Sequence, residues 1–209
     1  GQITGYFTFE FVEVDHYTDC YHDLLVREMV YDDLDTLKQF MTFFASQGDQ
    51  IERVRFLSPD PDLHMLFLNP DTGENRAHDG CIQEIGRRTM GYMCRILDVA
   101  AYFRSQPHCS APAARDFVLE LQVEDGFLKD NSGSYFLHVS GNRVEPAGST
   151  APQVTLRTDI AALSSLVMGA YSLDKAVARG VMDISDPSFL PDVQNAIGWH
   201  RKPVNYTYF

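Results

Sequence analysis

The chain ends in the sequence NYTYF, so its last residue, Phe209, carries both an aromatic ring and the free α-carboxylate. Chain ends usually fray in water, but docking one phenylalanine buries apolar area that stabilises by about 1.5–3 kcal/mol. Docking would carry the carboxylate inside, where it can accept a proton from an amine as a general base. Two interpretations stay open at this point. The Phe209 carboxylate is a general base, or the Phe209 ring only packs the tail against the core.

A polar stretch near the start contains residue types that bind metals. Its members are Asp15, His16, Asp19, Cys20, His22 and Asp23. Such side chains ligate zinc and other transition metals, but this spacing matches no compact metal motif. We therefore assign no metal site to this chain. The other histidines are isolated in the sequence, and they are His64, His78, His108, His138 and His200.

The four cysteines are scattered and form no C-x-x-C pair. They are Cys20, Cys81, Cys94 and Cys109. Their spacing argues against a zinc ribbon and against a small disulfide framework. Reduced thiols are the default in a cytoplasm. Residues 1–5 contain no basic region followed by an apolar stretch, as a signal peptide would, and no apolar run approaches the roughly 18 residues of a spanning helix. A cytoplasmic protein is expected.

The sequence offers no good phosphate-binding loop. A helix N-terminus with small residues can hold the pyrophosphate of CoA, and acetyltransferases use the form R/Q-x-x-G-x-G/A for this purpose. The nearest stretch runs from Arg87 to Met93, and it places Tyr92 or Met93 where a small residue is needed. The sequence also lacks G-x-G-x-x-G, P-loop and G-x-S-x-G motifs. We therefore expect no CoA site in this chain.

The formal net charge is −12, from 29 acidic and 17 basic residues. Such a field repels nucleic acids and anionic lipid surfaces, and it attracts cations such as polyamines and amine-rich sugars. Solubility alone is the other interpretation of this charge. Nucleic acid and membrane partners are not expected.

Two structural units are predicted from the periodicity of apolar residues. The first contains strands over residues 5–14, 24–30, 51–57 and 91–96, a helix between Asp33 and Gly48, and a helix capped by Asp98. The second contains strands over residues 117–124, 135–139, 143–146 and 153–157, followed by helices over 159–167, 173–179 and 188–197. Small and proline-bearing residues mark the boundary. The predicted domains are residues 1–106 and 115–209, with a linker at 107–114.

Several segments, taken in order, resemble the enhanced-intracellular-survival (Eis) family of GNAT-type N-acetyltransferases. They are Leu24 to Phe56, Gly91 to Phe103, Phe117 to Leu137, Asp159 to Ser172 and the aromatic tail. The resemblance runs over nearly the whole chain. It implies an α+β fold: a partial GNAT-like mixed sheet with helices, and then a sterol-carrier-protein-like antiparallel sheet packed with helices.

The resemblance also implies a function. Family members acetylate amines, including those of aminoglycosides in some cases, and a separate N-terminal domain binds acetyl-CoA. This chain would then bind no cofactor and would be inactive alone. Its acceptor would be an amine-bearing small molecule or a lysine side chain, and the protein would be a homo-oligomer. Phe209 would be the catalytic base, and Tyr208 and Phe209 would contact substrate, although Tyr208 stands where some members have an acidic residue.

Two non-catalytic alternatives remain open. A sterol-carrier-like domain can hold an apolar ligand between its sheet and helices, and the residues that would line such a cavity can equally fill the core. They are Phe117, Leu119, Leu163, Leu166 and Val167. The chain can also be an assembly module whose aromatic first strand pairs across a subunit interface.

Overall fold

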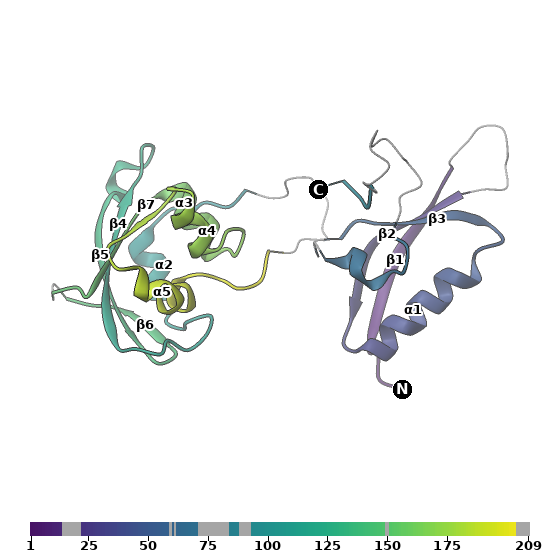
Figure 1. Cartoon of the computed structure of the whole chain (residues 1–209), viewed down its shortest axis with the longest axis horizontal. Helices are drawn as coiled ribbons and strands as arrows, with labels where there is room; N and C mark the ends of the chain where they lie inside the picture. Colours follow the sequence, from purple (N-terminus) through teal and green to yellow (C-terminus); the bar gives the residue numbers. More distant parts are fainter. Residues whose placement is uncertain are drawn as a thin grey trace. The chain divides into compact units, whose positions relative to one another are not determined.

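The computed structural model describes residues 1–13, 22–58, 60, 62–70, 84–87, 93–148 and 151–203 of the 209. Contacts divide these residues into two compact units, one up to residue 87 and the other from 93 to 203. Each unit has its own buried apolar cluster, and Figure 1 labels helices and strands of both units. The units are therefore described separately.

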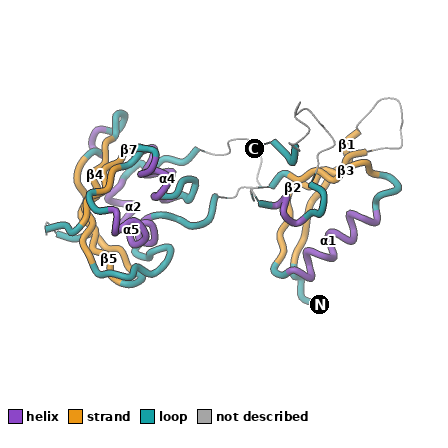
Figure 2. Tube along the Cα trace, in the orientation of Figure 1, coloured by secondary structure: helices purple, strands orange, loops and turns teal. Residues whose placement is uncertain are grey.

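The first unit is a three-stranded mixed sheet with one long helix on it. Its elements are β1 (Gly5–Glu13), β2 (His22–Tyr31), α1 (Leu34–Ser46), β3 (Ile51–Phe56) and a 3-10 turn (Leu63–Leu66). The strand order is β1-β2-β3, with β1 antiparallel and β3 parallel to β2. Helix α1 makes the crossover that a parallel pair requires, and it runs along the sheet (Figure 2). The expected mixed sheet is confirmed.

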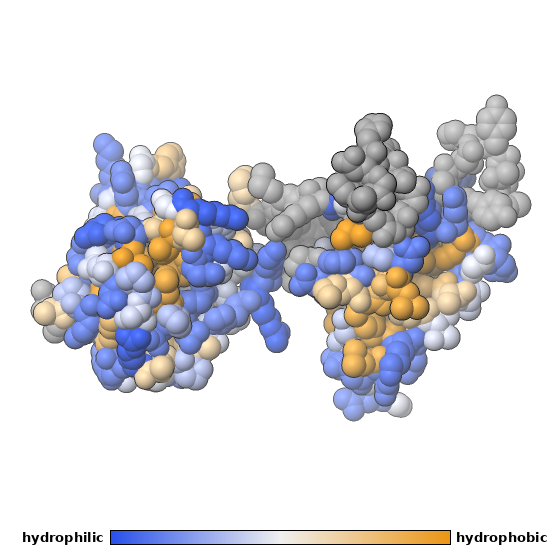
Figure 3. All heavy atoms as spheres, viewed as in Figure 1, coloured by the Kyte–Doolittle hydropathy of each residue, from blue (hydrophilic) through white to orange (hydrophobic). Residues whose placement is uncertain are grey.

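Aromatic rings join α1 to the sheet. The Phe7 ring lies 4.8 Å from Phe40, 5.3 Å from Phe43 and 4.9 Å from Phe44, measured between centroids. Farther along β1, Phe9 is 38% exposed and Phe11 is 49% exposed. On the aromatic face of this strand, only Phe7, near its beginning, is partly buried. Figure 3 shows apolar side chains gathered on the viewed face of this unit.

The second unit is a five-stranded sheet packed with helices. Its helices are α2 (Val99–Ser105), α3 (Ile160–Val167), α4 (Leu173–Ala178) and α5 (Leu190–Ile197). Its strands are β4 (Phe117–Glu124), β5 (Gly133–Ser140), β6 (Arg143–Pro146), β7 (Val154–Asp159) and β8 (Asp183–Ile184). The order is β6-β5-β4-β7-β8.

This sheet is mixed, which corrects the expected antiparallel sheet. Strands β4, β5 and β6 form an antiparallel meander, but β7 pairs with β4 in parallel. After β6 the chain returns past β4, where Gln153 N donates to Val118 O at 3.0 Å, and it then continues along the free edge of β4. The alternation of residues 153–157 predicts a strand, but it does not specify the neighbour of that strand.

The core of the second unit lies between one face of the sheet and the helices. On β4 the residues Phe117, Leu119, Leu121 and Val123 are buried, and α3 packs into the same cluster. Helix α2 belongs to this core as well, because Val99 and Phe103 are part of it.

The division between the units falls before α2, whereas the sequence analysis predicts a linker at residues 107–114. Those residues are hydrogen-bonded into the second unit. Cys109 N donates to Asn142 O at 3.1 Å, Val144 N donates to Pro107 O at 3.0 Å, and Ala113 N donates to Gly141 O at 2.8 Å. Small and proline-bearing residues in this segment cover the end of a sheet instead of separating two domains.

The described part of the predicted strand at 91–96, residues 93–96, is not a strand. Side chains of other elements satisfy its polar groups instead. Ile96 N donates to Ser164 Oγ at 3.0 Å, and Asn131 Nδ2 donates to Ile96 O at 3.4 Å. Arg95 pairs with buried Asp125 at 2.5 Å. The segment is thus fixed against α3 and the turn after β4.

Candidate functional site

The two predicted site residues, Tyr208 and Phe209, lie outside the described residues, which end at Pro203. The segment that leads to them is anchored to the second unit. Trp199 N donates to Leu166 O at 3.2 Å, and Ser110 Oγ donates to Gly198 O at 2.5 Å. The tail therefore begins at a fixed point beside the end of α3.

The N-terminus of α1 does not have the form of a phosphate site. Asp33 caps it, accepting a hydrogen bond from Thr36 N at 2.7 Å. This bond lowers the pKa of Asp33 below its usual value of 3.8. Asp32 and Asp35 add negative charge beside it. Because carboxylates already occupy the position where a helix N-terminus binds an anion, a pyrophosphate would be repelled.

The Asp33 cap leads to a prediction about acid stability. The pKa of Asp33 is lower in the folded state than in the unfolded chain. The ionised carboxylate therefore adds to the free energy of unfolding above pH 3.8, and this contribution is lost as the pH falls through the folded-state pKa. We expect Asp33→Asn, which keeps a capping oxygen, to be less stable than the wild type at neutral pH and to approach it in acid. Urea unfolding followed by circular dichroism measures this difference. Asp35→Asn, an exposed residue paired with Lys38, is the control, and a difference that grows in acid would contradict the prediction.

Of the six residues in the polar stretch with metal-binding side chains, only His22 and Asp23 are described. The Asp23 side chain is buried and serves as an ion-pair partner between β2 and β3. Its carboxylate lies 3.2 Å from Arg53 Nε and 3.5 Å from Arg55 Nη1. Among the residues with assigned positions, no group of three or more His, Cys, Asp or Glu is arranged to hold a metal ion.

His138, one of the isolated histidines, lies on β5 with its side chain 46% exposed. Its Nε2 lies 2.8 Å from Asp116 Oδ1. Hydrogen bonds from Ser140 and His138 lower the pKa of Asp116. A pair so open to water is a surface interaction, and it has none of the enclosure that a catalytic pair needs.

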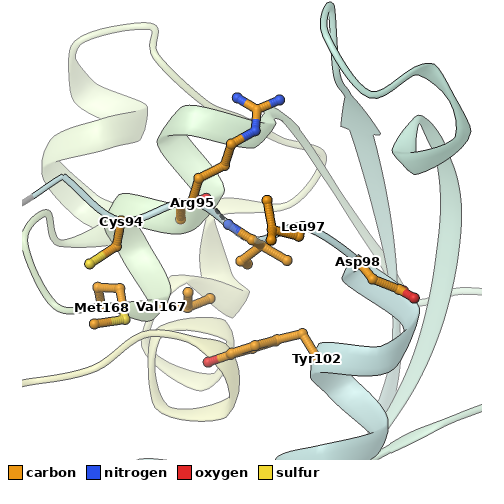
Figure 4. A pocket seen from close by; sticks show the side chains of 9 residues that line it. Cys94, Arg95, Leu97, Asp98, Tyr102, Val167 and Met168 are labelled. Carbon is orange, nitrogen blue, oxygen red and sulfur yellow. Dashed lines mark hydrogen bonds between the residues drawn. The ribbon is translucent and has the colours of Figure 1, made fainter.

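A cavity of about 260 Å³ opens in the second unit between residues 94–98, α2 and the end of α3 (Figure 4). It is lined by Cys94, Arg95, Ile96, Leu97, Asp98, Tyr102, Ser164, Val167 and Met168. The sulfur atoms of Cys94 and Met168 lie on one side of it, and the Arg95 guanidinium points away from Tyr102 (Figure 4). Burial raises the pKa of the Tyr102 phenol, so this hydroxyl is neutral at neutral pH, and apolar residues share the wall with the polar side chains of Arg95, Asp98 and Ser164.

The cavity is below the roughly 300–1,000 Å³ of sites for drug-sized ligands. It also lies apart from the sheet–helix layer that would hold an apolar ligand. Of the five residues named for that ligand, only Val167 lines it, while Phe117, Leu119, Leu163 and Leu166 are at most 2% exposed. These four fill the core. The sequence analysis missed Cys94, Tyr102 and Met168, because no sequence pattern connects them.

The acidic charge of the chain is concentrated in its first part. Residues 1–90 contain 17 acidic and 7 basic side chains, whereas residues 91–209 contain 12 and 10. The field that attracts cations therefore originates mainly from the stretch that forms the first unit. Across the described ranges, none of the helices has both the length and the apolar character needed to cross a membrane.

Two protein-family models match the chain. The acetyltransferase (GNAT) domain matches residues 1–96, and the sterol carrier protein domain matches residues 99–206. Among curated proteins, none matches the sequence significantly.

Solved structures share the fold over nearly the whole chain. A GCN5-related N-acetyltransferase from Anabaena variabilis ATCC 29413 is 19% identical over 93% of this chain and 45% of its own, with a TM-score of 0.65. Eis1 from Mycobacterium abscessus is 16% identical over 98% of this chain and 48% of its own, with a TM-score of 0.65. A probable N-acyltransferase from Enterococcus faecalis V583 is 14% identical over 95% of this chain and 45% of its own, with a TM-score of 0.68.

This chain thus spans about half the length of these three solved proteins. Its two domains follow one another as the sequence resemblance implied, a GNAT-like unit first and a sterol-carrier-like unit second. Because the sterol carrier protein model covers more than half of the chain, the chain belongs to that family, and with its GNAT domain it corresponds in fold to the C-terminal part of Eis-type acetyltransferases.

Proposed function

We propose that this chain is the substrate-side, C-terminal portion of an acetyl-CoA-dependent amine N-acetyltransferase of the Eis type, with the Phe209 carboxylate as its general base. The observation that carries the proposal is the succession of a GNAT domain and a sterol carrier protein domain in a chain half as long as its solved relatives. The remaining half of such a protein is long enough to hold a donor domain.

We assign acetyl-CoA to that other domain and no cofactor to this chain. The support is the capped N-terminus of α1, where Asp33 occupies the position that a pyrophosphate would need. The stretch from Arg87 to Met93 adds support through its sequence, because Tyr92 and Met93 are too large for close approach of a phosphate.

The acceptor is an amine-bearing small molecule or a lysine side chain. Such amines are cations at neutral pH, and the acidic first unit raises their local concentration. A protonated amine must lose a proton before it attacks a thioester, so the reaction needs a base. The carboxylate of Phe209 supplies it, and Tyr208 contacts the substrate beside it.

Assembly into a homo-oligomer is part of the same proposal. Its support is the exposure of Phe9 and Phe11 on β1, which is an edge strand of its sheet among the described strands. We place the protein in the cytoplasm, where reduced thiols such as the free Cys94 and Cys109 are the default.

The test compares acetyl-CoA consumption by this chain alone and by the chain joined to its acetyl-CoA-binding domain. Release of free CoA thiol is followed with a polyamine, an aminoglycoside and a lysine-containing peptide as acceptors. We expect turnover only from the joined protein and only with an amine present. Turnover by this chain alone would overturn the assignment of the donor site, and no amine-dependent turnover by the joined protein would overturn the proposed activity.

A further inference from the structure

Four residues, Gly198 to Arg201, form the last anchored segment before the tail, and we call them the tail anchor. Ser110 Oγ donates to Gly198 O at 2.5 Å, and Trp199 N donates to Leu166 O at 3.2 Å. His200 Nε2 lies 3.0 Å from Asn195 Oδ1. The tail anchor is thus held between α5, α3 and the segment before β4.

Gly169, in the turn after α3, is in close contact with the main chain of the tail anchor. A Cβ atom at this position would lie 2.1 Å from Arg201 O and 3.1 Å from Trp199 O. Those neighbours are main-chain atoms, so no side-chain rotation can relieve the overlap. Gly169 also has φ +71°, in the left-handed region that favours glycine. Any other residue at this position must push the tail anchor away.

Gly180, at the end of α4, is a natural comparison. It has nearly the same backbone conformation, with φ +68°, but nothing lies within 4 Å of the place where its Cβ would stand. A substitution there strains the turn without touching another segment. The two glycines therefore separate the effect of backbone strain from the effect of displacing the tail anchor.

The position of the tail anchor matters because the chain end is only eight residues beyond Arg201. Eight residues of fully extended chain, at about 3.3–3.6 Å each, reach at most about 29 Å, which limits the distance from Arg201 at which Phe209 can act. A shift at the start of so short a tether changes where its end can be placed. Misplacing a reacting group by about 1 Å can cost about 100-fold in rate.

We propose that Gly169 is a positioning residue for acetyl transfer. Because it has no side chain, the main chain of Arg201 can lie directly against the α3–α4 turn, and this contact fixes the start of the segment that ends at Phe209. This inference rests on the proposed function, because it requires the terminal carboxylate to act in the reaction. Gly169 itself touches neither substrate nor cofactor in this scheme.

The test compares Gly169→Ala with Gly180→Ala by two measurements. The first uses this chain, in which Trp199 is the single tryptophan, and records its emission and its quenching by acrylamide. We expect a shifted emission and altered quenching in Gly169→Ala and wild-type behaviour in Gly180→Ala. The second uses the protein joined to its donor domain, where we expect kcat to fall about 10–100-fold for Gly169→Ala, with KM for acetyl-CoA unchanged, and to stay at the wild-type level for Gly180→Ala.

Each outcome has a defined meaning. Wild-type Trp199 quenching in Gly169→Ala would overturn the anchoring role, and altered quenching with unchanged kcat would overturn the positioning role. If Gly169→Ala does not fold, Ser110→Ala replaces it, because this change removes the hydrogen bond to Gly198 O without altering a left-handed turn. If deleting Phe209 lowers kcat but the Gly169→Ala and Ser110→Ala variants do not, this inference is wrong and the proposed base stands. If deleting Phe209 does not lower kcat, the proposed base itself is wrong.

Discussion

We expect that ending the chain at Tyr208 lowers kcat of the donor-joined protein by about 10²–10⁴-fold, the usual contribution of a general base. The shortened chain still ends in a carboxylate, but this carboxylate now belongs to Tyr208. It is one residue short of its original position, which is about 3.3 Å along an extended chain. A proton acceptor must be within hydrogen-bond reach of the amine, so this displacement is enough to disable it. We expect KM for acetyl-CoA to stay unchanged, because the proposed function assigns the donor to another domain.

A variant that keeps the carboxylate in register provides the control. Phe209→Leu removes the aromatic ring but retains the position of the terminal acid, so we expect kcat within a few-fold of the wild type. Adding one glycine after Phe209 converts that acid into a peptide bond and should cost as much as the deletion. The dependence of kcat on pH distinguishes chemistry from folding, since the limb that reports deprotonation of the base disappears only when the acid is moved. Full activity of the glycine-extended protein would contradict the proposal.

Features that depend on neighbours in sequence could be predicted. Asp33 and Asp98 are expected at helix starts, and both accept a hydrogen bond from the backbone amide three residues later. A helix is expected over residues 173–179, and Gly180, which follows it, has the positive φ that favours glycine at a helix end. Alternation along residues 117–124 predicts a strand with one buried face, and β4 buries that face. In each case the pattern that reveals the element lies within a few residues along the chain.

Features that depend on distant partners were not predictable in this way. The segment at 93–96 alternates like a strand, yet its polar groups are satisfied by Ser164 and Asn131, which belong to elements far away in sequence. The parallel position of β7 depends on which edge of β4 is free. The cavity brings Cys94 and Tyr102 together with Met168 from the end of another helix, and no periodicity joins such positions. The fold class could be inferred from the sequence, but the contacts that hold residues 198–201 could not.

The largest stability effect is expected at Phe117, in the middle of the second core. This side chain is 2% exposed, and its ring centroid lies 5.2 Å from that of Phe189, so β4 and the turn before α5 meet at this ring. Phe117→Ala removes the whole ring from a closed core, and such changes cost about 3–5 kcal/mol. That cost is a large fraction of the roughly 5–15 kcal/mol by which a domain is usually stable.

Phe127 offers a control of the same residue type in the same unit. Its side chain is 81% exposed, and its ring lies 5.7 Å from the Arg95 guanidinium. Phe127→Ala loses only a cation–π contact at the surface, so we expect a cost below about 1 kcal/mol. Urea unfolding followed by the emission of Trp199 reports on this unit, because the single tryptophan is anchored to α3. Equal losses in the two variants would mean that Phe117 is not enclosed, and the sheet–helix layer would then have space for an apolar ligand after all.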